Sequence, residues 1–77
     1  MILTETGLTF RLRMRRNDPM TGGACSEYQC VEHPRLTCMV QRPNRDAACV
    51  ETYHVEGIAA QHYHDLSAAL TAMEANP

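Results

Sequence analysis

Seventy-seven residues, of which 44% are apolar and 5% aromatic, fit one globular domain with a small core rather than a disordered segment. Residues 1–45 carry seven arginines against four acidic residues, whereas residues 46–77 carry five acidic residues and no arginine. The net charge of −2 does not by itself predict nucleic-acid binding, but the asymmetry can steer a charged partner.

The N-terminal sequence MILTETGLTFRLRMRR has no cationic stretch followed by an apolar run, so it does not resemble a secretory signal. No segment approaches the roughly 18 consecutive apolar residues that a membrane span needs. We therefore expect a cytoplasmic protein that does not enter a membrane. Thiols in that compartment are usually reduced.

Residues 8–15, LTFRLRMR, alternate apolar and polar side chains, which is typical of a half-buried strand. The alternation predicts a solvated side with arginines about 7 Å apart. Such a side either resists aggregation or contacts an acidic partner. The predicted buried side holds Leu8, Phe10, Leu12 and Met14, and the solvated side holds Thr9, Arg11, Arg13 and Arg15.

Two less regular segments follow. Residues 17–24, NDPMTGGA, combine Asn-Asp-Pro with Gly-Gly and predict a turn or a long loop. Residues 25–34, CSEYQCVEHP, show no clean period. They leave open an irregular loop, a short helical turn or a strand that ends before Pro34.

The segments RLTCMVQR and AACVETYHV flank PNRD and predict a β-hairpin. Pro43 suits the first central position of a turn and Asn44 tolerates the next, so we expect the hairpin to be centred between them. In that register Cys38 faces Cys49, with Cβ atoms about 4.5–5.5 Å apart. The same register places Met39 opposite Ala48 and Val40 opposite Ala47.

The Ala-rich C-terminal part predicts one amphipathic helix over residues 58–75. An alternative keeps residues 59–64 as a strand paired with ETYHV across Glu56-Gly57, with Asp65 as the N-cap of a shorter helix. Either way, the predicted fold is α+β, a small antiparallel sheet of about three strands packed against one C-terminal helix. The apolar face of the longer helix holds Ala59, Tyr63, Leu66, Leu70 and Met73.

The four cysteines allow three hypotheses. A disulfide between Cys38 and Cys49 would stabilise the fold by roughly 2–3 kcal/mol. A zinc site would draw on Cys25, Cys30, His33 and Cys38 or Cys49, but no Cys-x2-Cys pair occurs. The compartment favours the third, reduced cysteines packed as small hydrophobes, with no metal or other cofactor.

Three histidines, His54, His62 and His64, suggest a metal site only if His62 and His64 lie on a strand, where both rings share one face. On the expected helix the two rings diverge, so they are interpreted as polar surface. No nucleophile elbow, phosphate loop or HExxH motif is present, and we expect no enzymatic activity.

The charged residues are therefore the candidates for contact with a protein partner, because mixed charge gives steering and specificity. The arginines of residues 11–16 are also the one candidate for phosphate contact, but Phe10 is expected in the core, where no base can stack on it. Either the basic strand or the acidic C-terminal half can make the contact. The partner-binding candidates are Arg11, Arg13, Arg15, Glu51, Glu56 and Asp65.

All basic residues are arginines, which indicates a GC-rich coding genome and a bacterial or phage origin. With FRLRMRR as its opening strand and HDLSAALTAMEA as its closing helix, the chain resembles small phage and mobile-element proteins that include anti-CRISPR inhibitors. The resemblance is one of size, composition and layout over the whole chain, and transfers no residue role. It implies a non-enzymatic inhibitor that binds a CRISPR effector complex. The alternative is a small zinc-stabilised or nucleic-acid-binding accessory module.

Overall fold

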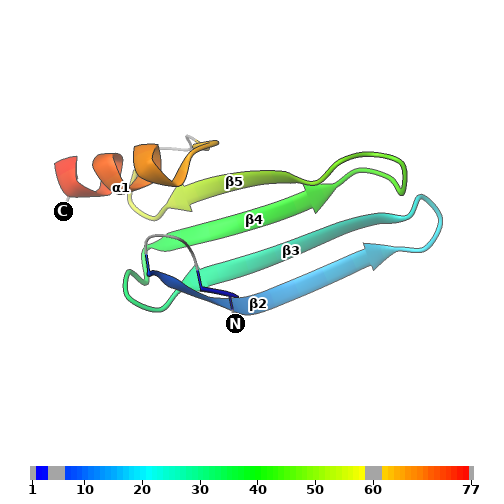
Figure 1. The fold of residues 1–77 in the computed structure, drawn as a ribbon, viewed down its shortest axis with the longest axis horizontal. Helices are drawn as coiled ribbons and strands as arrows, with labels where there is room; N and C mark the ends of the chain where they lie inside the picture. Colours follow the sequence, from blue (N-terminus) through cyan, green and yellow to red (C-terminus); the bar gives the residue numbers. More distant parts are fainter. Residues whose placement is uncertain (1, 4–6, 59–61, 77) are drawn as a thin grey trace.

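The computed structural model describes residues 2–3, 7–58 and 62–76. They form an antiparallel sheet with the strand order β1-β2-β3-β4-β5 and one C-terminal helix, which confirms the predicted α+β class (Figure 1). Residues 25–30, for which the sequence left a loop, a helical turn or a strand open, belong to strand β3. The sheet therefore has more strands than the three or so that were predicted. The elements are β1 Ile2–Leu3, β2 Thr9–Asp18, β3 Gly23–Cys30, β4 Leu36–Arg42, β5 Val50–Val55 and α1 Leu66–Ala75.

Strand β2 contains a β-bulge at Arg13. Leu12 faces Tyr28 on β3 and Met14 faces Glu27, so Arg13 is an extra residue on β2. Side chains beyond the bulge therefore lie on the opposite face from the one that simple alternation predicts. Leu12 lies on the predicted side but is 44% exposed, and the predicted side is wrong for Met14, which lies on the face away from α1.

The β4–β5 hairpin is centred two residues later than predicted. Cys38 faces Tyr53, not Cys49, while Met39 faces Thr52 and Val40 faces Glu51. The turn forms over residues 44–47, where the Asn44 side chain accepts a hydrogen bond from the Asp46 N–H at 2.9 Å. The longer loop leaves Cys49 exposed, about 13 Å along the strand from the position facing Cys38.

The chain after β5 follows the alternative with a short helix. Tyr63 pairs with Tyr53 in an isolated antiparallel bridge, with backbone hydrogen bonds of 2.6 and 2.8 Å. Asp65 caps α1 by accepting from the Ser67 N–H at 3.0 Å, so the helix begins at Leu66 and the predicted start at residue 58 is wrong. Residues 59–61 lie outside the described part.

The core lies between α1 and the end of the sheet where β5 stops. Phe10 and Tyr53 meet there with ring centroids 6.5 Å apart. Leu66, Leu70 and Met73 of α1 pack against this core, as predicted, and Ala69 is fully buried beneath them. The far half of the sheet extends beyond the helix (Figure 1). The buried core residues are Phe10, Cys30, Leu36, Cys38, Tyr53, Val55 and Ala69.

Candidate partner-binding surface

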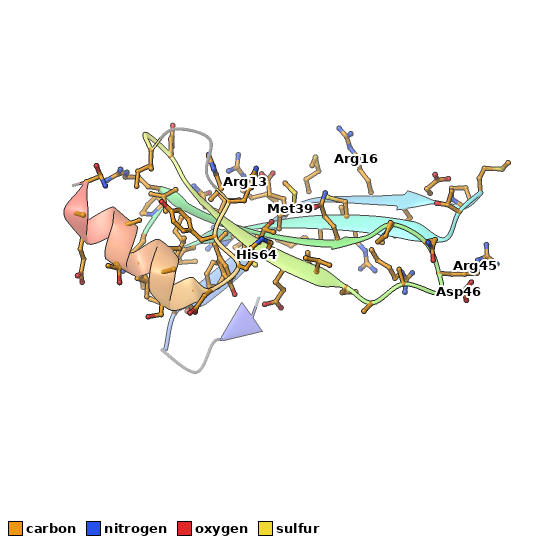
Figure 2. The ribbon with its side chains drawn as sticks, turned by 90° about the horizontal axis from the view of Figure 1, so that it is seen from above. Arg13, Arg16, Met39, Arg45, Asp46 and His64 are labelled. Carbon is orange, nitrogen blue, oxygen red and sulfur yellow. The ribbon has the colours of Figure 1, made fainter. Side chains whose placement is uncertain are left out.

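The helix covers one face of the sheet, and we call the other the open face. Register partners share a face, so the buried Leu36 and Val55 mark the helix side, and alternation sends Thr37 and His54 to the other side. Figure 2 shows Arg13 and Arg16 on the side away from α1. The open face is built by Arg11, Arg13, Met14, Arg16, Cys25, Glu27, Gln29, Thr37, Met39, Gln41, Val50, Thr52 and His54.

The bulge changes which arginines of β2 lie on the same face of the sheet. Arg11 precedes it and faces Gln29, while Arg16 follows it and faces Cys25, and both partners lie on the open face. Arg15 faces Ser26 and therefore lies on the helix side. All of these arginines are exposed. The predicted ladder of Arg11, Arg13 and Arg15 is wrong, and the arginines of the open face are Arg11, Arg13 and Arg16.

The acidic candidates lie at the opposite edge of the sheet and already make contacts within the fold. Glu51 on β5 accepts a hydrogen bond from the Tyr53 hydroxyl at 3.2 Å. Glu56 is exposed just after β5, and its backbone oxygen accepts from Arg35 Nε at 3.0 Å. Asp65 is the N-cap of α1. The two predicted charge groups are thus separated by the width of the sheet, and Asp65 has a structural role that the sequence also indicated.

The turns at the far end of the sheet are tied together by contacts that the sequence did not predict. The Arg45 N–H donates to the Thr21 oxygen at 3.1 Å, and Arg42 Nη2 donates to the Gly22 oxygen at 3.0 Å. A cleft of about 680 Å³ lies beside these ties, lined by β2 residues such as Arg16 and by Arg42. Arg42 Nε is buried with no hydrogen-bond partner among the described residues. Sequence periodicity carries no signal for this cleft, because its lining combines residues of four strands and of the turns between them that are distant in sequence.

The four cysteines are free and dispersed, and two of them pack as small hydrophobes as the thiol hypothesis expected. Cys30 and Cys38 are buried in the core, Cys25 is half-buried on the open face and Cys49 is exposed. Burial, with a smaller contribution from the Glu51 charge, raises the pKa of Cys38 to about 11, and burial also raises the pKa of Cys30. The two buried thiols therefore stay protonated near neutral pH and are poor nucleophiles.

The proposed zinc ligands are not brought together, because Cys25 lies on the open face whereas Cys30 and Cys38 lie in the core. Within the described residues no group of three or more metal-ligating side chains is found.

The histidines are arranged differently from the prediction. His62 precedes the bridging Tyr63 instead of lying on a helix, and its ring centroid is 5.8 Å from that of His54. Both rings line a small pocket of about 130 Å³ with Glu27 and Met39 of the open face. The pair that the sequence analysis considered, His62 and His64, is therefore not the pair that the structure brings together, and His64 is exposed (Figure 2).

Comparison of the chain with family models, curated proteins and solved structures finds no match. Within the described part of the chain, no helix has the length and apolar character to span a membrane.

Proposed function

We propose that this protein is a small non-enzymatic binding domain whose open face contacts an acidic surface of a protein partner. The observation that carries the proposal is the placement of Arg11, Arg13 and Arg16 on one uncovered face at one edge of the sheet. Half-buried Met14 and Met39 lie on the same face and supply apolar area beside the charges. Arginines beside flexible methionines are side chains suited to contact with a protein partner.

A protein surface fits this face better than a nucleic acid. Tyr28 faces Cys38 on the helix side, Phe10 is 3% exposed, and Tyr53 is buried, so these rings offer no base a stacking platform on the open face. Glu27 also lies among the arginines and would repel phosphates. A nucleic-acid-binding accessory module is therefore the weaker alternative.

The resemblance to phage and mobile-element inhibitors makes a CRISPR effector complex the partner class that we propose to test. Occupying a surface of such a complex needs no chemistry from the inhibitor, only shape and charge that match. The proposed role is inhibition in the cytoplasm by binding an effector subunit.

Charge reversal tests which surface makes the contact. Immobilised protein is titrated with purified CRISPR effector complexes, and the Arg11→Glu/Arg13→Glu variant is expected to weaken binding by about tenfold or more, mainly through faster dissociation and lost steering. Arg45→Glu, an exposed arginine of the β4–β5 loop outside the open face, serves as the control and is expected to bind nearly as well. Circular dichroism of each variant checks the fold.

The opposite variant, Glu51→Arg/Glu56→Arg, distinguishes the two edges. Loss of binding in this variant alone would move the contact to the acidic edge near β5. If neither variant changes the affinity, the charge-steered interface is wrong.

A further inference from the structure

Within the described residues, the outer edge of β2 has no strand partner along most of its length. β1 pairs only with Thr9 and Phe10, and from Leu12 to Asp18 no strand of the described chain lies beside β2 on that side. A strand edge of this kind presents free N–H and C=O groups that can pair with another chain. In Figure 1, β2 forms the border of the sheet over this length.

Hydrogen bonds at the β2–β3 turn show which backbone groups face the free edge. The Asp18 oxygen accepts from the Gly22 N–H at 2.8 Å, so the backbone of Asp18 points toward β3. Neighbouring residues of a strand point their backbone groups to opposite edges. Asn17 and Arg15 therefore direct their N–H and C=O groups outward, whereas Arg16 directs its groups toward β3.

The side chains along this edge determine which charge is favoured on a strand that pairs with it. Because of the bulge, Arg13 and Arg16 border the edge on the open face and Arg15 borders it on the helix face. A segment lying alongside β2 would send alternate side chains to both faces and meet an arginine on each. Acidic side chains on that segment would be favoured, since opposite charges on neighbouring strands attract.

The same arginines exclude a second copy of this chain as the occupant. Two antiparallel β2 edges would bring arginines against arginines, and like charges directly opposite destabilise a strand pair. A partner segment rich in Asp and Glu avoids this repulsion.

We propose that β2 binds an extended acidic segment of the partner by strand addition along Leu12–Asp18, with main-chain hydrogen bonds to Arg15 and Asn17. This inference rests on the proposed function and specifies how the partner is held. Main-chain pairing supplies affinity in such complexes, and side chains on the two faces supply specificity.

The probe is a synthetic peptide of alternating glutamate and valine, as long as Leu12–Asp18 and blocked at both ends. Amide hydrogen exchange of the isotopically labelled protein is followed by NMR with and without saturating peptide. The expected result is exchange slowed by about tenfold or more at Arg15 and Asn17, because these amides gain acceptors. The amide of Arg16, already directed toward β3, is expected to change little.

Two controls sharpen the result. A peptide of alternating lysine and valine is expected not to bind, because the edge is cationic. Asn17→Pro removes an outward N–H that the sheet does not use, and is expected to weaken binding of the acidic peptide by about tenfold relative to Asn17→Ala.

Failure of strand addition can be told apart from failure of the proposed function. An acidic peptide that does not bind, or that binds without protecting Arg15 and Asn17, overturns strand addition. The proposed function still stands in that case if Arg11→Glu/Arg13→Glu weakens binding to the effector complex. If that variant binds the complex as well as the parent does, the proposed contact through the open face is wrong, whatever the peptide result.

Discussion

At the scale of single residues, Gly22 sets how closely the β2–β3 turn and the β4–β5 loop approach each other at the far end of the sheet. Its φ of +74° lies in the left-handed region, and a Cβ built there would come within 2.6 Å of Arg45 Cβ. Gly22→Ala therefore combines a backbone cost of about 1–2 kcal/mol with a clash against the next loop. We expect a total loss of about 2–3 kcal/mol in the free energy of unfolding, measured by urea denaturation.

Gly7 provides the matched control for this substitution. Its φ is +80°, but a Cβ would meet nothing within 4 Å. Gly7→Ala should therefore show the backbone cost alone, about 1–2 kcal/mol, which is about 1 kcal/mol less than the loss expected for Gly22→Ala. Equal losses in the two variants would mean that the Arg45 loop moves aside without cost, and that the close approach of the two turns does not limit stability.

At the scale of elements, the start of α1 depends on one side chain. Asp65→Ala removes the acceptor of the Ser67 N–H and is expected to destabilise the protein by about 1 kcal/mol, seen as a lower midpoint in thermal or urea unfolding. Asp65→Asn keeps an acceptor and removes the charge, so its stability should stay near that of the parent. Loss of partner binding in the stable Asp65→Asn variant would show that this carboxylate also contacts the partner, as the sequence suggested.

The elements also show how far local pattern predicts this fold. Alternation located the start of β2, and the N-cap signal at Asp65 located α1, because both are set by neighbours in sequence. The bulge at Arg13 and the β4–β5 register depend on pairing with β3 and on the contact between Arg45 and Thr21, which connect distant segments. Local alternation therefore assigned Arg15 to the wrong face and gave no placement for Arg16, because both residues follow the bulge.

At the scale of the whole molecule, the core occupies only one end. The helix packs near the end of β5, so the far halves of β2 and β3 have no second layer among the described residues on either face. Sheet stability there depends on cross-strand pairs and on the ties between the two turns. An uncovered sheet of this kind stays adaptable, which suits a surface that must fit a partner.

This arrangement predicts uneven protection of the backbone in the free protein. Amides of β3 and β4 beside the buried Leu36 should exchange only through global unfolding, whereas the amides of Arg16 and Cys25 at the far end should exchange through smaller openings. We expect the free energy of opening at the far end to be lower by about 1 kcal/mol or more, from native-state exchange in low urea. Exchange of the far-end amides with the same free energy and the same urea dependence as the core would contradict this, since it would make the sheet one cooperative unit despite its one-sided core.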